Sequence, residues 1–182
     1  SELYLASHDS RVKSRLMEVF LVVRDKIYTN PGCLNMFFNA DWKPIPDYDS
    51  FGHDIETAFL LVEAAHVLGK QNDMKTTAAA KHLVDHALDY GYDPKNGGFY
   101  DSGPTFGPPS KLEKVWWTQA EGLNALLLMH LTYRSQTRKY WDEFVKTWNF
   151  VKKYQVDQKN GGWYSTVSTE LTPEISQNKS DQ

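Results

Sequence analysis

The amino-acid sequence predicts an all-α fold in which helical hairpins stack into a layered array. Three observations support this prediction. Five long segments have helical periodicity, segments with one apolar side alternate with segments that are apolar nearly all round, and one loop motif recurs after 64 residues. Together they describe a repeating unit of one helical hairpin and one loop, which buries its apolar faces by stacking on its neighbours.

Three of the five segments, residues 11–27, 74–90 and 137–155, carry their apolar side chains on one face. In the first of them, Leu16 and Val23 belong to a single apolar stripe, and Arg and Lys residues occupy the opposite side. A helix of this kind covers a protein core with one face and meets solvent with the other. We therefore expect these three segments to be outer helices.

The other two segments, residues 55–68 and 120–131, are apolar nearly all round, which is typical of a helix surrounded by protein. Placed between the other three, they give the order outer, inner, outer, inner, outer. Around the second inner helix, four side chains at helical spacing are expected to form a core face: Trp116, Ala120, Leu123 and Leu127.

The connections between the expected helices alternate in length. Links from inner to outer helices are short, about residues 69–73 and 133–136, as expected for antiparallel neighbours. Links from outer to inner helices are long and hold strand-like pieces, and two of them share the motif Asp-x-Lys-Asn-Gly-Gly, at residues 93–98 and 157–162. Long ordered loops on one rim of a scaffold are common places for function.

Helical hairpins of this type stack naturally into a closed toroid, but five helices are too few to close one with six hairpins. We therefore expect residues 1–167 to form a single partial-barrel domain. Residues 1–7 resemble the last turns of a helix. Residues 168–182 are polar and aperiodic, so they are expected to be either a tail or a further loop whose next helix is missing.

Composition excludes several classes of function. The chain has 182 residues and a formal net charge of -3, which does not indicate an electrostatic grip on nucleic acid or anionic lipid. It has no signal-like opening and no apolar run long enough to cross a bilayer, so we expect no membrane partner and a cytoplasmic location. Cys33 is the only cysteine, which excludes an internal disulfide and fits a reducing compartment. Aromatic residues make up 14% of the chain. The favoured explanation is packing in the core, and the alternative is binding of a ring-bearing ligand such as a sugar.

His53 is the first candidate for a functional residue, because it opens an inner helix. Ser50 precedes it and suits an N-cap, and the positive end of the helix dipole keeps a histidine neutral and available as a base. Glu56 lies on the same helical face, where it could orient the ring or hold a substrate hydroxyl. The alternative is a capped helix with an incidental histidine.

Trp117 and Glu121 are the second candidate pair, one turn apart at the start of the other inner helix. A carboxylate on an otherwise apolar helix is costly unless it is hydrogen-bonded or faces a cavity, and an aromatic ring beside an acceptor suits a sugar. Trp117 follows His53 by the repeat spacing of 64 residues, so both pairs are expected at the same rim. The alternative is a buried glutamate bonded to loop backbone.

Other polar groups carry weaker signals. His82 and His86 lie one turn apart on an outer helix with acidic neighbours, and we expect a solvated polar face there rather than a metal site. The sequence contains no glycine-rich phosphate loop and no Gly-x-Ser-x-Gly nucleophile motif.

Three stretches of the chain resemble the signatures of cellobiose 2-epimerases, which belong to the N-acylglucosamine 2-epimerase superfamily. They are Ser-Phe-Gly-His-Asp-Ile-Glu at residues 50–56, Leu-Leu-Val-Glu-Ala-Ala at 60–65 and Trp-Trp-Thr-Gln-Ala-Glu at 116–121. Residues 37–42, Phe-Phe-Asn-Ala-Asp-Trp, also match the pattern. The resemblance runs along nearly the whole chain and covers about the C-terminal half of a family member. It implies a partial (α/α)6 barrel, with inner and outer helices and short β-hairpin-like loops on one rim.

The resemblance implies an isomerase that inverts C2 of the reducing-end aldose of a β-1,4-linked disaccharide through an enediolate. It assigns acid/base work to His53 with Glu56 beside it, sugar stacking to Trp117 and hydroxyl binding to Glu121. Phe59 stands where cellobiose epimerases usually have Trp, which implies a different stacking geometry or substrate preference. Inversion needs acid/base groups on both faces of C2. The resemblance also implies no organic cofactor and no essential metal. The family's second histidine lies beyond this sequence, so the chain alone is expected to be inactive.

Two other functions remain open at this stage. An aldose–ketose isomerase of the same superfamily would use the same histidine to move a proton between C1 and C2. A non-catalytic half-barrel would bind an oligosaccharide or monosaccharide, or self-associate through its exposed flanks.

Overall fold

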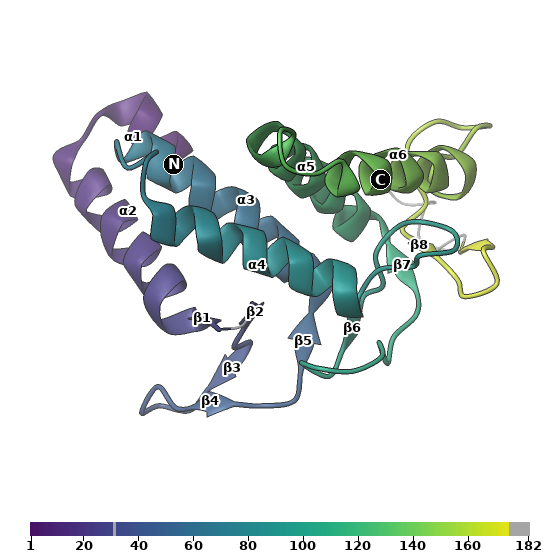
Figure 1. Ribbon diagram of the computed structural model, residues 1–182, viewed down its shortest axis with the longest axis horizontal. Coiled ribbons are helices and arrows are strands. Elements are labelled where there is room, and N and C mark those ends of the chain that lie inside the picture. Colours follow the sequence, from purple (N-terminus) through teal and green to yellow (C-terminus); the bar gives the residue numbers. More distant parts are fainter. Residues whose placement is uncertain (31, 175–182) are drawn as a thin grey trace.

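The computed structural model describes residues 1–30 and 32–174, and within them the fold is predominantly helical (Figure 1). The α-helices of this part are α1 (Glu2–Ser7), α2 (Ser10–Val22), α3 (Phe51–Val67), α4 (Met74–Tyr90), α5 (Trp116–Tyr133) and α6 (Lys139–Phe150). A π-helical turn extends α2 (η1, Val23–Ile27) and another extends α6 (η2, Val151–Gln155). The all-α prediction and its five long helices are confirmed.

Both inner helices begin four residues earlier than the apolar pattern indicates. The first turn of α3 holds His53 and Asp54, and the first turn of α5 holds Thr118 and Gln119. These polar side chains interrupt the apolar pattern although the backbone is already helical. The early polar turn of each inner helix is therefore the part that sequence periodicity overlooks.

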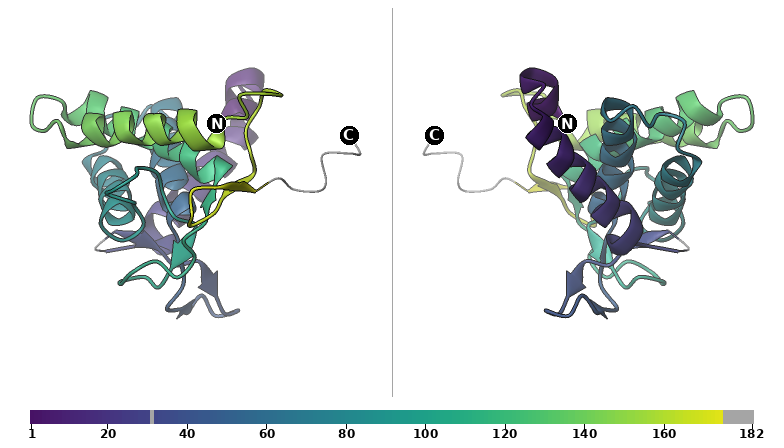
Figure 2. Two further views of the ribbon diagram at one scale, coloured as in Figure 1. Left: turned by 90° about the vertical axis from the view of Figure 1, so that its right-hand side faces the viewer. Right: turned by 90° about the vertical axis from the view of Figure 1, so that its left-hand side faces the viewer.

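Within residues 1–30 and 32–174, nine two-residue strands connect the helices. They are β1 (Tyr28–Thr29), β2 (Cys33–Leu34), β3 (Phe37–Phe38), β4 (Pro44–Ile45), β5 (Asp49–Ser50), β6 (Ser102–Gly103), β7 (Lys114–Val115), β8 (Thr166–Val167) and β9 (Pro173–Glu174). All pairings are antiparallel: β1 with β2, β3 with β4, β5 with β6, and β8 between β7 and β9. They gather at the end of the molecule where α3 and α5 begin (Figure 1), and the β3–β4 hairpin projects away from the helices (Figure 2).

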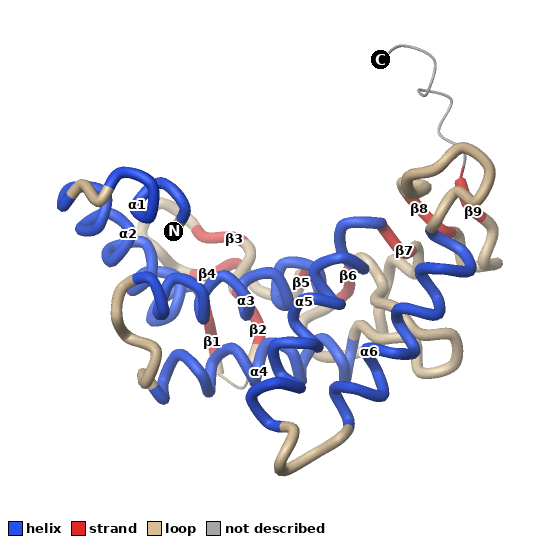
Figure 3. The backbone as a smooth tube through the Cα atoms, turned by 90° about the horizontal axis from the view of Figure 1, so that it is seen from above, coloured by secondary structure: helices blue, strands red, loops and turns tan. Residues whose placement is uncertain are grey.

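The helices form two layers. α3 and α5 contact each other, α4 packs on α3, and α6 packs on α5 (Figure 3). α2 contacts α3 on the other side. The main core lies between these layers and includes Phe51, Ile55, Leu83, Phe99 and Leu126, all with no exposed surface. The predicted alternation of inner and outer helices is confirmed, and the structure is a partial α/α barrel.

The predicted core face of α5 is wrong. Trp116 is 49% exposed and Leu127 is 38% exposed, whereas Ala125, Leu126 and Met129 are buried. A helix that is apolar all round gives no sequence signal for the side its neighbours cover, and here α3 and α6 cover the Ala125–Met129 side. In the described part of the chain, α5 and α3 keep apolar side chains uncovered, among them Leu60 and Leu131.

The repeated loop motif has the same structure in both copies. Asp93 and Asp157 each accept hydrogen bonds from two backbone N–H groups and one asparagine side chain in the turn that follows. The glycines of both motifs have positive φ, between 74° and 85°, which a side chain would strain. In the first copy Asp93 also forms a buried ion pair with Lys114, with 2.7 Å between Oδ2 and Nζ.

The segment from residue 168 onward is only partly described. Its first residues turn back and end in β9, which pairs with β8. The remainder, residues 175–182, lies outside the described residues, so the boundary at residue 168 stays a prediction. Within the described residues, no helix has both the length and the apolar character that crossing a membrane requires.

Candidate active site

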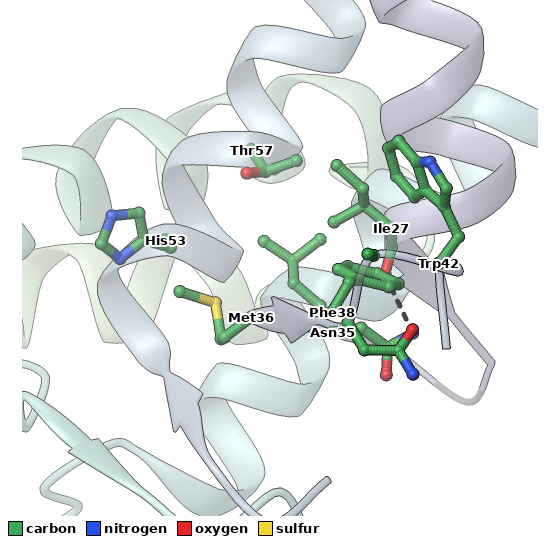
Figure 4. Close-up of a pocket in the computed structure, with 10 residues that line it drawn as sticks. Ile27, Asn35, Met36, Phe38, Trp42, His53 and Thr57 are labelled. Carbon is green, nitrogen blue, oxygen red and sulfur yellow. Dashed lines mark hydrogen bonds between the residues drawn. The ribbon is translucent and has the colours of Figure 1, made fainter. Parts of the chain in front are cut away.

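A pocket of about 480 Å³ opens beside the start of α3 (Figure 4). His53 and Thr57 of α3 form one wall, and the segment from β2 to the β3–β4 hairpin forms the other. The lining residues are Ile27, Leu34, Asn35, Met36, Phe38, Asn39, Ala40, Trp42, His53 and Thr57. The pocket thus combines apolar and aromatic surface with two amides, one hydroxyl and one imidazole.

His53 is exposed, and Ser50 holds its ring. The distance between His53 Nδ1 and Ser50 Oγ is 2.8 Å. The predicted N-cap position of Ser50 is confirmed, but its side chain bonds to His53 and makes no capping hydrogen bond to the helix backbone. The hydroxyl can donate to Nδ1 or accept from it. When it accepts, Nε2 carries the free lone pair that a general base needs.

Trp117 lies directly against His53. Their ring centroids are 5.1 Å apart in an edge-on arrangement, with an interplanar angle of 68°. Gly52 makes this contact possible, because a Cβ atom there would lie only 2.4 Å from Cη2 of Trp117. The first turns of α3 and α5 therefore meet at a glycine, and the structure brings His53 and Trp117 together.

Glu56 and Glu121 interact across the two inner helices. Burial raises the pKa of Glu121, the charge of Glu56 raises it further, and the side chain of Asn124 opposes the change. A nearby negative charge disfavours the ionised form of a carboxyl group, so this effect places Glu56 and Glu121 within electrostatic reach of each other. The second predicted pair thus lies on the same side of the molecule as the first.

The β3–β4 hairpin adds an aromatic surface that sequence reasoning did not single out as part of a site. The rings of Phe38 and Trp42 are 5.5 Å apart, and the ammonium of Lys26 lies 5.3 Å from the Trp42 ring. Trp42 has a φ of 60°, a left-handed conformation that is costly for a bulky residue and is concentrated at functional sites. The available signal was the aromatic stretch of residues 37–42.

A buried polar cluster lies beneath the turn that carries His53. Asp49 and Asp54 have no exposed surface, and His86 is 5% exposed. The expectation of a solvated face at His86 is therefore wrong. His86 lies one turn from Leu83 on the side of α4 that packs against α3, whereas His82, which bonds to Tyr28, is exposed. In the described part of the chain, this cluster is the one group with metal-like spacing, its ligand atoms lying within 4.8 Å of one another.

Comparison with known proteins decides the family. Residues 2–181 match the N-acylglucosamine 2-epimerase (GlcNAc 2-epimerase) family. This chain belongs to that family. Among curated family relatives, it is 29% identical over 179 residues to a cellobiose 2-epimerase of Ruminococcus albus, covering 95% of this chain and 44% of the relative. It is also 28% identical over 130 residues to a D-mannose isomerase of Marinomonas mediterranea, covering 71% of this chain and 31% of the relative.

Solved structures of a cellobiose 2-epimerase and of a D-mannose isomerase have the same fold. The cellobiose 2-epimerase of Bacillus thermoamylovorans superposes with a TM-score of 0.84 at 28% identity, covering 94% of this chain and 43% of the other. A D-mannose isomerase superposes with a TM-score of 0.80 at 20% identity, which shows a shared fold. The chain spans less than half the length of the curated relatives that it matches most fully.

Phe59 is the one predicted site residue that the structure does not bring together with the other four. It is partly buried in the third turn of α3 and is not among the residues that line the pocket. Of the four other predicted residues, His53 and Trp117 lie in the first turns of α3 and α5, and Glu56 and Glu121 lie in the second turns. The roles of all five residues stay predictions, as does a substrate contact for Phe59.

Proposed function

We propose that the natural protein containing this chain is a carbohydrate 2-epimerase that inverts C2 of the reducing-end aldose of a β-1,4-linked disaccharide. The observation that carries the proposal is the setting of His53. Its Nδ1 faces Ser50 Oγ, its ring edge lies against Trp117, and its side chain lines an aromatic pocket. The His53 imidazole is therefore fixed by a hydrogen bond and lies next to an aromatic surface that suits a sugar ring.

The chemistry begins with the open-chain aldose. Nε2 of His53 takes the proton from C2, and the electrons of that bond form a C1–C2 double bond while O1 becomes negative. An enediolate results, and inversion is complete when an acid returns a proton to the opposite face of C2 and O1 regains its carbonyl. One group would return the proton to the face from which it came, so a second acid is needed. Among the described residues that line the pocket, His53 is the one histidine.

Aromatic and polar side chains divide the binding of the sugar. Phe38 and Trp42 offer ring faces on one side of the pocket, and Trp117 offers another beside His53. Aromatic faces give large contact area at low entropic cost. Glu56 and Glu121 would accept hydrogen bonds from sugar hydroxyls.

Product analysis tests the proposal. The natural protein is incubated with cellobiose, and the products are separated by chromatography. We expect the C2 epimer, glucosyl-mannose, and a loss of about 10²–10⁴-fold in its formation for His53→Asn. His82→Asn is the matched control, because His82 is exposed on α4, contacts Tyr28, and like Tyr28 is not among the residues that line the pocket. Unchanged epimer formation in His53→Asn contradicts the proposal.

The same experiment separates a second candidate function, aldose–ketose isomerisation. Similarity to a D-mannose isomerase favours this alternative. An isomerase returns the proton to C1 instead of C2, so the product is a ketose.

A non-catalytic role in self-association is favoured by the apolar side chains that α3 and α5 leave exposed, among them Leu60, Leu127 and Leu131. Light scattering tests it, since a monomer without affinity for cellobiose contradicts this alternative. A cytoplasmic location remains part of the proposal, because the one cysteine, Cys33, is free and buried.

A further inference from the structure

We propose that Asp49, Asp54 and His86 form a buried proton-sharing triad that fixes the turn carrying His53. The three would then be positioning residues for proton transfer, and this inference rests on the proposed function of His53. None of the three touches the pocket, and they come from three different elements: β5, α3 and α4.

The triad encloses the His53 turn from both sides. Asp49 directly precedes Ser50, and Asp54 directly follows His53, so the hydrogen bond between Ser50 and His53 lies between the two carboxylates in sequence. Asp54 Oδ1 accepts from the backbone N–H of Leu34 at 3.1 Å. Since Leu34 lines the pocket, Asp54 ties the pocket wall to the first turn of α3.

His86 supplies the opposite anchor. Its Nε2 lies 2.7 Å from the carbonyl oxygen of Thr105, in the loop after β6. Its Nδ1 lies 2.9 Å from Asp54 Oδ2 and 3.3 Å from Asp49 Oδ2. One imidazole thus links α4, the loop after β6 and both carboxylates.

Counting donors shows that the triad must hold extra protons. A carbonyl oxygen only accepts, so Nε2 of His86 carries a hydrogen. Nδ1 faces carboxylate oxygens, and neither oxygen of Asp49 meets a donor in good hydrogen-bond geometry. Two further protons, distributed over Nδ1 and the two carboxyl groups, satisfy these contacts and make the cluster neutral. A neutral cluster is favoured because an unpaired charge on a side chain without solvent exposure, such as Asp49 or Asp54, costs free energy.

The surroundings support this proton count. Burial raises the pKa of Asp49, and the charge of Asp54 raises it further, to about 8, against the opposing effect of His86. Burial also raises the pKa of Asp54 well above its ordinary value. Two other titratable groups adjoin the triad. Burial, then Asp54 and Asp49, raise the pKa of Cys33 on β2 to about 12, and the Tyr90 ring on α4 lies 5.0 Å from the His86 ring.

A divalent cation is the competing occupant, because one such ion with two carboxylates would also be neutral. Protons are favoured for two reasons. The cluster offers three ligand residues, and the full burial of both carboxylates leaves no solvent path for the water that would complete the coordination. In addition, 2.9 Å is an ordinary hydrogen-bond distance between a ring nitrogen and a carboxylate oxygen.

NMR of the histidine rings in the 182-residue chain tests the triad without substrate, so a failure of the epimerase proposal leaves this test intact. In the unmodified chain, the His53 signals are expected to shift in a step near pH 8, as the triad loses a proton. Asp49→Asn keeps a donor toward Asp54 and is expected to fold and to abolish this step. Asp54→Asn is expected to displace the His53 signals at all pH values.

Asp89→Asn is the matched control, because Asp89 is an exposed carboxylate on α4, the helix that also carries His86. This variant should leave the His53 signals and the step near pH 8 unchanged. Persistence of the step in Asp49→Asn overturns the proposal, even when Asp54→Asn fails to fold. Metal analysis of the purified chain supplies the other decisive result. We expect far less than one metal ion per chain, whereas one bound divalent ion that is lost in Asp49→Asn overturns the proton-sharing triad.

Discussion

Gly52 and Trp117 pack against each other where the first turns of α3 and α5 meet. A Cβ atom on Gly52 would lie 2.4 Å from Cη2 of Trp117 and 2.8 Å from Oγ1 of Thr118, closer than side chains approach in folded proteins. The absence of a side chain at residue 52 therefore sets how near His53 and Trp117 come to one another. This contact joins the two halves of the candidate site.

Replacing Gly52 with alanine is expected to push these turns apart. Since the neighbouring atoms belong to a ring and a buried threonine, the free energy of unfolding should fall by about 1–3 kcal/mol, measured by urea denaturation. Tryptophan fluorescence should shift as well. Gly69→Ala is the control. Alanine is disfavoured there by the φ of 73° alone, because nothing lies within 4 Å of an added Cβ. Equal effects on fluorescence in the two variants would contradict the close contact at Gly52.

Lys114 and Asp93 stabilise the first copy of the repeated loop. The Lys114 ammonium is 2.7 Å from Asp93 Oδ2 and from the Gly97 carbonyl oxygen, and its side chain is 2% exposed. Lys114→Ala leaves a buried carboxylate without its partner and should lower the free energy of unfolding by about 3–5 kcal/mol. Arg138→Ala removes an exposed ion pair with Asp142 and should change it by about 0–1 kcal/mol. Similar losses in both variants would rule out a special role for Lys114.

The same ion pair predicts a loss of stability in acid. Burial alone would raise the pKa of Asp93, but Lys114 and Asn96 outweigh it and lower the pKa to about 2. A lowered native pKa means that the stabilisation is present above about pH 4, the ordinary value, and is lost as the pH falls toward 2. Urea denaturation of Asp93→Asn at pH 2, 4 and 6 should show a smaller dependence on pH than the unmodified chain. An unchanged dependence would contradict the assignment.

Asp49 predicts the opposite trend at higher pH. Its raised native pKa means that its contribution to stability is complete below about pH 4 and is lost as the pH rises through about 8. The slope is at most about 1.4 kcal/mol per pH unit for one proton. Asp49→Asn should remove this decline between pH 5 and 9 in urea denaturation. A decline of equal size in the variant would assign it to other groups.

Trp42 should matter for binding more than for stability. Its ring contributes to the pocket while its backbone has a φ of 60°, so Trp42→Gly loses the ring face and relieves the strained backbone. We expect weaker binding of cellobiose, measured by calorimetry, with a melting temperature that is unchanged or higher. Trp148→Ala, at a 41% exposed position on α6, is the control for loss of a surface tryptophan. Unchanged binding in Trp42→Gly would remove the hairpin from the sugar site.

Sequence patterns predicted the helices and the pairing of the two site motifs for identifiable reasons. Helical periodicity reports burial directly, and the 64-residue spacing between His53 and Trp117 carried both into equivalent first turns. The environment of His86 was predicted wrongly, because the polar partners that make its burial tolerable, Asp49 and Asp54, are 37 and 32 residues away in the sequence. Such a contact depends on tertiary packing, which periodicity does not report.

The pocket wall was hidden for a related reason. Phe38 and Trp42 face the pocket because a short hairpin with a left-handed residue turns them toward α3, and two-residue strands leave no alternation to detect. The exposed apolar side of α5 was likewise not predictable, since its sequence is apolar on every side. Sequence alone predicted the family resemblance and the first-turn residues His53 and Trp117. It did not predict the geometry of the loops.

The claim that His53 moves the C2 proton is tested most directly by isotope exchange. The natural protein is incubated with cellobiose in D₂O, and deuterium at C2 of the reducing-end sugar is measured by NMR and mass spectrometry. Deuterium should enter C2 with the unmodified protein and with His82→Asn, and its rate should fall about 10²–10⁴-fold in His53→Asn. Undiminished exchange in a folded His53→Asn, or epimer formed without deuterium at C2, would contradict proton transfer by His53.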